Sequence, residues 1–324
     1  MASARPLHEP DPLDDFERRS LTFLGREKTV YVGGRGPGVI VMAEMPGISP
    51  YVTRFARLVR DAGFTVWMPS LFGRPGRPLS LPYLASSLAR ACVSREFRVL
   101  ASNASSPVTR WLRALAAHAH PLCGGKGVGA IGMCFTGNFA LSLLLEPAVR
   151  APVLSQPSLP LHDPAGLHIA PDELRAVKER LERDDLTVLA YRFAGDRLCR
   201  AQRFAAYERA LGERFQGRVL PDAAANPEAP FESPHSVVTL HLIDREGEPT
   251  RRAVDEILAF FRTRLVADAA RAPGAGDAPG TGAAAAAGAA SSGTVPAAGA
   301  ARAEEGTRRA AGTVAAGETA TLRR

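Results

Sequence analysis

Cys134 is the residue of this sequence whose surroundings best suit a nucleophile. It stands in the run GMCFTG at 132–137, after the apolar stretch 128–131 and before the helix-like segment 138–145. A strand, one strained residue and a helix start, with small neighbours, form the turn called a nucleophile elbow. The helix N-terminus then offers free N–H groups to a thiolate and to a developing oxyanion. The pattern predicts a cysteine nucleophile; the alternative is a free cysteine packed in the core.

An acidic residue and a histidine follow Cys134 in the order of an α/β-hydrolase triad. Asp196 comes after the apolar run 187–193, and His235 lies in the loop after the run 217–220. The thiolate would attack a carbonyl, the imidazole would accept and return a proton, and the carboxylate would fix the imidazole tautomer. A loop-capping role for Asp196 remains open. So does replacement of His235 by another histidine, namely His162, His168 or His241.

Glu44 is a third carboxylate, surplus to a triad, and it directly follows the apolar run 39–43. In parallel sheets, active groups gather at the carboxyl ends of the strands, so we expect Glu44 near Cys134. A carboxylate there could hold the thiol neutral until substrate arrives, or act as the base that ionises it. The alternative is a solvated carboxylate at a strand end.

The elements that must position these residues alternate along the chain. Short apolar runs predict strands at 39–43, 65–68, 128–131, 151–154, 187–193 and 217–220. Helix-like stretches lie at 51–62, in the region 84–115, and at 138–145, 171–183, 203–215 and 250–265. A hairpin made of 21–24 and 29–32 precedes them. This alternation predicts an α/β fold with a mostly parallel central sheet and helices on both faces.

Three segments follow from composition: an N-terminal arm at 1–20, an α/β-hydrolase domain at 21–268 and a tail at 269–324. The whole chain is 46% hydrophobic and 23% charged, as expected for a globular protein with a sizeable core. The tail consists largely of Ala, Gly, Thr and Ser with interspersed Arg and Glu. Because such a segment cannot offset the entropy lost on ordering, we expect it to be disordered.

The charge of the chain does not indicate a nucleic-acid partner. Its net charge of +7 comes from 37 Arg and 3 Lys that are scattered along every segment. Nucleic-acid binding needs basic residues gathered in a patch, so we expect no such partner. No apolar run approaches the ~20 residues needed to cross a bilayer, and the first residues are polar. We therefore expect no membrane association and a cytoplasmic location.

The cysteines and the glycine-rich turns argue against a metal or cofactor. The four cysteines are too widely spaced for a zinc site or a disulfide framework, which predicts reduced thiols: Cys92, Cys123, Cys134 and Cys199. The glycine-rich segments 33–38 and 124–127 each precede a predicted strand, which is the wrong side for a phosphate cradle. We interpret both segments as turns.

Five stretches resemble the dienelactone hydrolase family of cysteine α/β-hydrolases, over about residues 21–265. They are VIVMAEMPG at 39–47, AGFTVWMPSLFGR at 62–74, GMCFTG at 132–137, Gly195-Asp196 and His235-Ser236. The resemblance implies a triad of Cys134, Asp196 and His235, with Glu44 near the cysteine. It also implies an oxyanion hole formed by the backbone N–H groups of Met45 and Phe135. The implied reaction is hydrolysis of a small ester or lactone through an acyl-cysteine, without a cofactor or metal.

The sequence departs from the family where substrate would bind. Members that act on dienelactones carry an arginine four residues after the triad histidine, to hold the substrate carboxylate, and this position is Thr239. Arg95 and Arg74 are candidates to replace that arginine. Two smaller departures are Thr136 in place of an elbow glycine and Ser70 in place of an aspartate.

Two other functions fit parts of the pattern. An amidotransferase-type hydrolase also uses an elbow cysteine, but it draws its histidine and acid from one short His-x-Glu run, which does not follow Cys134. A catalytically silent hydrolase fold could instead serve as a binding or thiol-redox module, with Cys134 oxidising reversibly. The sequence predicts neither the natural substrate nor the oligomeric state.

Overall fold

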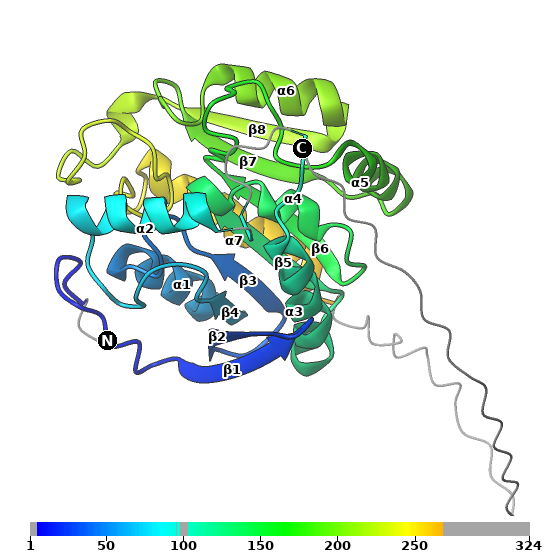
Figure 1. Cartoon of the computed structure of the whole chain (residues 1–324), viewed down its shortest axis with the longest axis horizontal. Helices are drawn as coiled ribbons and strands as arrows, with labels where there is room; N and C mark the ends of the chain where they lie inside the picture. Colours follow the sequence, from blue (N-terminus) through cyan, green and yellow to red (C-terminus); the bar gives the residue numbers. More distant parts are fainter. Residues whose placement is uncertain (1–4, 95, 98–102, 268–324) are drawn as a thin grey trace, which may run out of the picture. The chain divides into compact units, whose positions relative to one another are not determined.

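The computed structural model describes residues 5–94, 96–97 and 103–267, apart from the side chains at positions 92 and 93 (Figure 1). These residues belong to the first of two units, residues 1–271 and 272–324. The predicted tail, 269–324, and the substrate-binding candidate Arg95 lie outside the described residues.

One eight-stranded sheet organises the described chain, in the order β1-β2-β4-β3-β5-β6-β7-β8. The first two strands pair antiparallel, β2 pairs antiparallel with β4, and all other neighbours are parallel. The mostly parallel sheet and the N-terminal hairpin are therefore confirmed. The strands are β1 Glu17–Phe23, β2 Arg26–Gly33, β3 Gly38–Met42, β4 Thr65–Pro69, β5 Val128–Met133, β6 Val149–Ser155, β7 Val188–Phe193 and β8 Phe215–Leu220.

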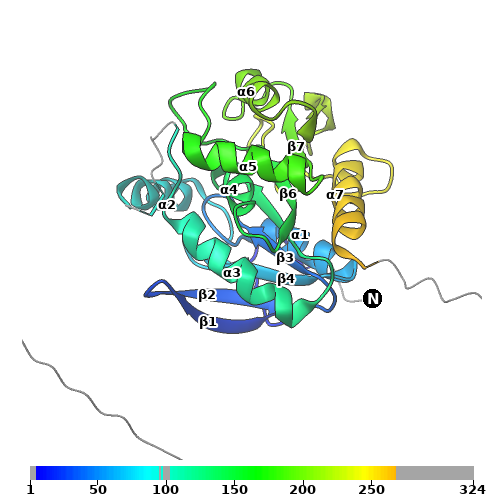
Figure 2. The same ribbon diagram turned by 90° about the vertical axis from the view of Figure 1, so that its right-hand side faces the viewer.

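Helices cover both faces of the sheet, as Figure 2 shows from the side. The core on one face contains side chains of α1 and α7, and the core on the other contains side chains of α3, α4, α5 and α6. The helices are α1 Pro50–Asp61, α2 Leu81–Val93, α3 Val108–Cys123, α4 Phe139–Leu143, α5 Pro171–Arg183, α6 Ala201–Leu211 and α7 Pro249–Leu265. None of the helices in the described ranges is long and apolar enough to cross a membrane.

The central strands are continuous apolar runs because both of their faces are covered. In β3, Val39 and Val41 pack into the core of α1 and α7, while Ile40 and Met42 pack into the opposite core. All four side chains are fully buried. Successive strand residues point to opposite faces, so a doubly covered strand needs an apolar residue at every position.

Two predicted helices have different limits in the structure. The helical region 84–115 is two helices, α2 and α3, and Pro107 caps the second. The predicted helix 203–215 ends at Leu211 because Gly212 takes a left-handed φ of 57°, which terminates a helix at little steric cost. The chain then enters β8 at Phe215.

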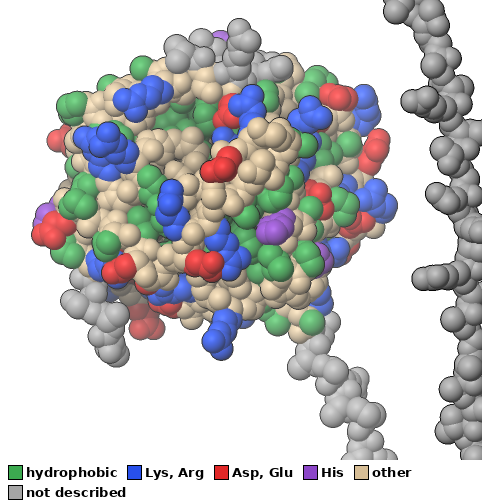
Figure 3. All heavy atoms as spheres, turned by 60° about the horizontal axis from the view of Figure 1, so that its bottom comes forward, with side chains coloured by type: hydrophobic (Ala, Val, Ile, Leu, Met, Phe, Trp, Pro, Cys, Tyr) green, Lys and Arg blue, Asp and Glu red, His purple; other side chains and the backbone are tan. Residues whose placement is uncertain are grey.

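Charged side chains of both signs are interspersed on the face shown in Figure 3. The basic side chains do not gather into a patch on that face. Opposite charges also form ion pairs in the described chain: Arg251 pairs with Asp244 at 2.6 Å and with Asp255 at 3.0 Å.

Candidate active site

The turn after β5 has the geometry of a nucleophile elbow. Cys134 has a φ of 51°, in the left-handed region, and it opens a short 3-10 turn, Cys134–Thr136, before α4. A Cβ on Gly132 would lie 2.0 Å from the Thr136 carbonyl oxygen, and one on Gly137 would lie 2.6 Å from the Pro157 Cα. The turn therefore requires glycine at both positions, as the sequence pattern predicted.

Thr136, one of the departures from the family pattern, is part of this turn. Its side chain is fully buried. Its Oγ1 accepts a hydrogen bond from the Met133 N–H at 2.9 Å and lies 2.9 Å from the Met42 carbonyl oxygen, which it can donate to. The threonine thus ties β5 to the end of β3 and holds the elbow beside Glu44.

The structure brings Asp196 and His235 together. Their Oδ2 and Nδ1 atoms lie 2.7 Å apart, and the Asp196 side chain is buried. Asp196 follows β7, and its Oδ1 accepts hydrogen bonds from the N–H groups of Leu198 at 2.8 Å and Cys199 at 2.9 Å. The aspartate thus caps its loop and orients the imidazole at the same time.

The other histidines have different environments. His241 holds the loop that carries His235: its Nδ1 accepts from the Ser236 N–H at 3.2 Å, and its Nε2 lies 3.0 Å from the Phe231 carbonyl oxygen. His168 contacts Ser106, with 2.7 Å between Nε2 and Oγ. His162 is exposed. Among these four histidines, His235 is the one that contacts Asp196.

The electrostatics of His235 favour its protonated form. Burial works against protonation, but the interactions with Cys134 and Asp196 outweigh it and raise the pKa of His235 well above its usual range. Burial lowers the pKa of His241, which favours the neutral ring that accepts from the Ser236 N–H. The site therefore places a readily charged imidazole beside the cysteine and a neutral one behind it.

Glu44 lies at the end of β3 and is buried. Three neutral groups donate to it: the Ser236 hydroxyl at 2.6 Å and the Gln156 amide at 3.2 Å on Oε2, and the Thr239 hydroxyl on Oε1. Burial raises the pKa of Glu44, which the three donors and His235 only partly offset. Within the described ranges, no Lys or Arg forms an ion pair with it.

A cavity of about 450 Å³ opens over these residues. Cys134, His235 and Glu44 line it, and so do side chains of α2, the helix that lies near the end of β3 in Figure 1. The rest of its lining is largely apolar and includes Met45, Leu84, Leu88, Phe135, Leu161 and Leu198. Such a site fits a small, mostly apolar molecule with one reactive polar group.

The remaining predicted positions fall into two groups. Met45 and Phe135 line the cavity, and the Phe135 N–H belongs to the first turn after β5, whose N–H groups have no partner within the helix. Arg74 is not among the described residues that line the cavity. Thr239 stands where family members that act on dienelactones carry an arginine, and its hydroxyl donates a hydrogen bond to Glu44.

Ser158 is a site residue that the sequence analysis did not find. It is fully buried, and its hydroxyl lies 3.6 Å from the Cys134 sulfur and 3.5 Å from the His235 Nε2. Its backbone N–H donates to the Cys134 carbonyl at 2.9 Å. No motif marks a serine in a loop, so only the fold brings it to the nucleophile.

Metal-binding clusters are absent from the described part of the chain: no three His, Cys, Asp or Glu residues lie close enough together to hold an ion. Of the cysteines whose side chains the structure describes, all are free thiols: Cys123, Cys134 and Cys199.

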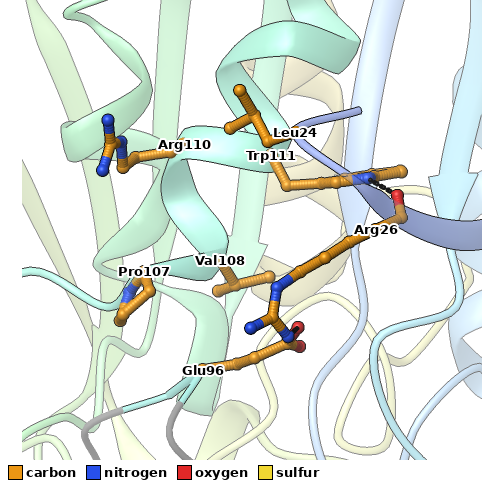
Figure 4. Close-up of a pocket in the computed structure, with 7 residues that line it drawn as sticks. All are labelled: Leu24, Arg26, Glu96, Pro107, Val108, Arg110 and Trp111. Carbon is orange, nitrogen blue, oxygen red and sulfur yellow. Dashed lines mark hydrogen bonds and ion pairs between the residues drawn. The ribbon is translucent and has the colours of Figure 1, made fainter. Parts of the chain in front are cut away.

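A second hollow, of about 250 Å³, lies between the β1–β2 turn and α3 (Figure 4). The Trp111 indole donates to the Arg26 carbonyl at 2.9 Å, and Glu96 pairs with Arg26 and with Lys28 at its base. The hollow is lined by none of the predicted catalytic residues.

Comparison with known proteins finds a similarity to one family over part of the chain. The family model described as the dienelactone hydrolase family matches residues 22–167, which include Glu44 and Cys134. This part of the chain resembles the dienelactone hydrolases, in agreement with the resemblance seen in the sequence motifs. A carboxymethylenebutenolidase from a Pseudomonas strain is 32% identical over 117 residues, which are 35% of this chain and 46% of that protein. The chain spans less than half the length of the curated relatives it matches.

Solved structures extend the likeness to dienelactone hydrolases beyond residue 167. A dienelactone hydrolase-like promiscuous phosphotriesterase from metagenomic libraries has 18% identity and a TM-score of 0.54, over 77% of this chain and 98% of its own. A candidate dienelactone hydrolase from Klebsiella pneumoniae has 18% identity and a TM-score of 0.53, over 76% and 97%. At this identity the likeness concerns the fold alone, and it confirms the predicted α/β-hydrolase fold.

Proposed function

We propose that this protein hydrolyses small carboxylic esters or lactones, with Cys134 as the nucleophile. The observation that carries the proposal is the convergence of three groups at one end of the cavity. The Cys134 elbow, the Asp196–His235 pair at 2.7 Å and the buried Glu44 come from the ends of β5, β7 and β3 and from the loop after β8. The family match and the name of the Pseudomonas relative, a carboxymethylenebutenolidase, support the same reaction class.

In the first half of the reaction, the Cys134 thiol gives its proton to the His235 Nε2 and the thiolate attacks the substrate carbonyl carbon. The N–H groups of Met45 and Phe135 stabilise the resulting oxyanion, because they donate more strongly to it than to the ground-state carbonyl. The carbon–oxygen bond to the leaving group then breaks, and His235 returns its proton to the leaving oxygen. An acyl-cysteine remains.

In the second half, His235 takes a proton from water as the water attacks the acyl-cysteine. The second tetrahedral intermediate collapses, the carbon–sulfur bond breaks with its electron pair on sulfur, His235 returns its proton to the Cys134 thiolate, and the carboxylic acid leaves. Asp196 keeps Nδ1 protonated throughout, so that Nε2 is the nitrogen that exchanges the proton.

Burial raises the pKa of Glu44, which favours its protonated form and so limits the negative charge close to the thiolate and the oxyanion. Its position also makes it a candidate to return a proton within the site. Replacement by Gln should change the hydrolysis rate and its pH profile, and wild-type behaviour would leave Glu44 with a structural role alone.

The test is to mix the purified full chain with a panel of activated aryl esters and unsaturated lactones. Product release and intact protein mass are followed together. We expect release and a transient acyl mass on Cys134. Cys134→Ala should show neither, and His235→Ala or Asp196→Asn should slow turnover on the order of 10³–10⁴-fold.

Cys123→Ala is the matched control. Cys123 is also a free thiol, but its sulfur accepts from the Trp67 indole at 3.2 Å, in a different part of the molecule. It should retain full turnover. Unchanged turnover in Cys134→Ala would refute the nucleophile. Folded wild-type protein with a titratable thiol but neither release nor adduct would instead support the binding or thiol-redox module.

A further inference from the structure

Ser158 is held against the nucleophile from two directions. Its backbone N–H donates to the Cys134 carbonyl at 2.9 Å, which ties the loop after β6 to the elbow. Its hydroxyl donates to the Gln156 carbonyl at 3.0 Å. The side chain is fully buried, so water does not compete for these contacts.

Gln156 provides the carbonyl that accepts from the Ser158 hydroxyl. It has a φ of 36°, unusual for a residue with a side chain, and its N–H donates to the Tyr191 carbonyl at 2.7 Å. Its amide donates to Glu44 at 3.2 Å. The same residue therefore anchors the buried acid with its side chain and the Ser158 hydroxyl with its carbonyl.

The Ser158 hydroxyl is a neighbour of both atoms that exchange the proton in the proposed reaction. Its Oγ lies 3.6 Å from the Cys134 sulfur and 3.5 Å from the His235 Nε2. The distance to sulfur is within the range of an O–H···S contact, because sulfur is a large acceptor. A hydroxyl rotates freely, so its proton can turn from the Gln156 carbonyl to a sulfur that has become negative.

We propose that Ser158 is a further catalytic residue, whose hydroxyl donates a hydrogen bond to the Cys134 thiolate and stabilises the thiolate–imidazolium pair. The thiol proton passes to the His235 Nε2, and Ser158 keeps its own proton. Because a hydrogen bond to a charged acceptor is stronger than one to a neutral thiol, the hydroxyl favours the ionised form. The proposal rests on the function proposed above.

The charged and titratable groups that line the cavity with Cys134 are His235, Asp196, Glu44, His241, Arg197 and Tyr51, and Cys199 lies behind them. Ser158 is neutral, so its removal leaves the charges of these groups in place. A change in the ionisation of Cys134 in a Ser158 variant then reports the lost hydrogen bond.

The test measures the rate at which iodoacetamide alkylates Cys134 in the full chain as a function of pH, with peptide mapping to assign the cysteine. For Ser158→Ala we expect the alkylation midpoint to rise by about one pH unit, which is about a tenfold lower thiolate fraction below the midpoint. The acid limb of the kcat/KM profile for ester hydrolysis should move to higher pH by a similar amount.

Ser142→Ala is the matched control. Ser142 is a buried serine on α4, and its hydroxyl has no hydrogen-bond partner among the described residues. The variant should leave the midpoint unchanged. Ser158→Thr and Ser158→Val form a second pair of equal shape that differs by the hydroxyl alone. Thr should retain the wild-type midpoint and Val should raise it.

Equal midpoints in wild type and Ser158→Ala, or in the Thr and Val variants, would overturn the role of Ser158. Alkylation needs no turnover, so this failure is distinct from failure of the proposed function. In the latter case wild-type protein releases no product from any ester or lactone, whatever its thiol reactivity.

Discussion

Asp11 in the arm and Glu44 in the site are both buried carboxylates, but their partners differ. In the arm before β1, Arg57 of α1 donates to Asp11 at 2.6 Å and to Asp15 at 2.8 Å, and Arg60 donates to Asp15 at 2.6 Å. In the site, Glu44 receives neutral hydroxyl and amide donors.

The partners decide the charge of each group. Hydrogen bonds from Arg57 lower the pKa of Asp15. At Asp11 burial acts to raise the pKa, but the hydrogen bonds from Arg57 and the Leu13 N–H, together with the charges of Arg57 and Arg5, outweigh it and lower the pKa. Burial raises the pKa of Glu44 in spite of its three donors. Neutral donors therefore do not replace a cation when a carboxylate is desolvated. Arg57 and Arg60 of α1 form ion pairs with the arm, whereas no arginine among the described residues forms an ion pair with Glu44.

The largest loss of stability is expected when Arg57, the cation that pairs with the arm, is removed. Arg57→Ala would leave Asp11, whose side chain is 2% exposed, without its main partner. We expect a loss of about 2–3 kcal/mol in the free energy of unfolding at pH 7, measured by urea denaturation. Both aspartates have a lowered pKa when folded, so their contribution is present above the unfolded pKa of about 4 and is lost as the pH falls below it. The difference in the free energy of unfolding between Arg57→Ala and wild type should therefore become smaller as the pH falls below about 4.

Arg35→Ala provides the control for this experiment. Arg35 is exposed and forms no ion pair with any described residue. Its replacement should change the free energy of unfolding by less than about 0.5 kcal/mol. A similar loss in both variants would mean that general charge, and not the Arg57 pairs, stabilises the arm.

A smaller effect is expected when the site loses one neutral donor. Thr239→Val removes the hydroxyl that donates to Glu44 and keeps the shape of the side chain. We expect a loss of about 1 kcal/mol in the free energy of unfolding, since one buried acceptor is left with fewer donors. Thermal and urea denaturation of Thr239→Val and Thr239→Ser would show this, and equal stability of the two variants would contradict it.

The smallest expected change in the free energy of unfolding is a gain, from Glu44→Gln. Glu44→Gln removes an acid whose pKa is raised by burial in the folded protein, whereas the unfolded chain ionises it above its ordinary pKa. Wild type therefore loses stability as pH rises from about 4 through the raised folded pKa, and the Gln variant does not. We expect the variant to gain up to about 1 kcal/mol relative to wild type near neutral pH. A gain that is the same at pH 4 and pH 8 would show that the charge of Glu44 is not its source.

The sequence allowed much of the site to be predicted because polar residues that follow buried strands meet at one edge of a parallel sheet. Glu44, Cys134 and Asp196 each follow an apolar run, and the structure places all three at the same cavity. Ser158 and Gln156 could not be found in this way. Their positions depend on a left-handed residue and on hydrogen bonds between distant segments, which leave no periodic signal in the sequence.

In the fold as well, some features could be predicted from the sequence and others could not. The strands of the sheet could be predicted from continuous burial, since every position of β3 and β5 must be apolar or small. The anchoring of the arm could not, because Arg57 lies 46 positions from Asp11 and surface charges give no hint of which pairs will form. Long-range ion pairs are a property of the packed structure and not of local pattern.

The left-handed backbone of Cys134 exposes the reactive sulfur at a cost in folding stability. At a φ of 51° any residue other than glycine carries a steric cost of about 1 kcal/mol. An inactive Cys134→Gly protein should therefore unfold at a higher temperature than Cys134→Ala. Substitution of Cys134 by glycine would stabilise the folded protein, so mutations that improve stability alone would remove the nucleophile. Continued presence of a cysteine there would need selection for its chemistry, because folding alone favours its loss.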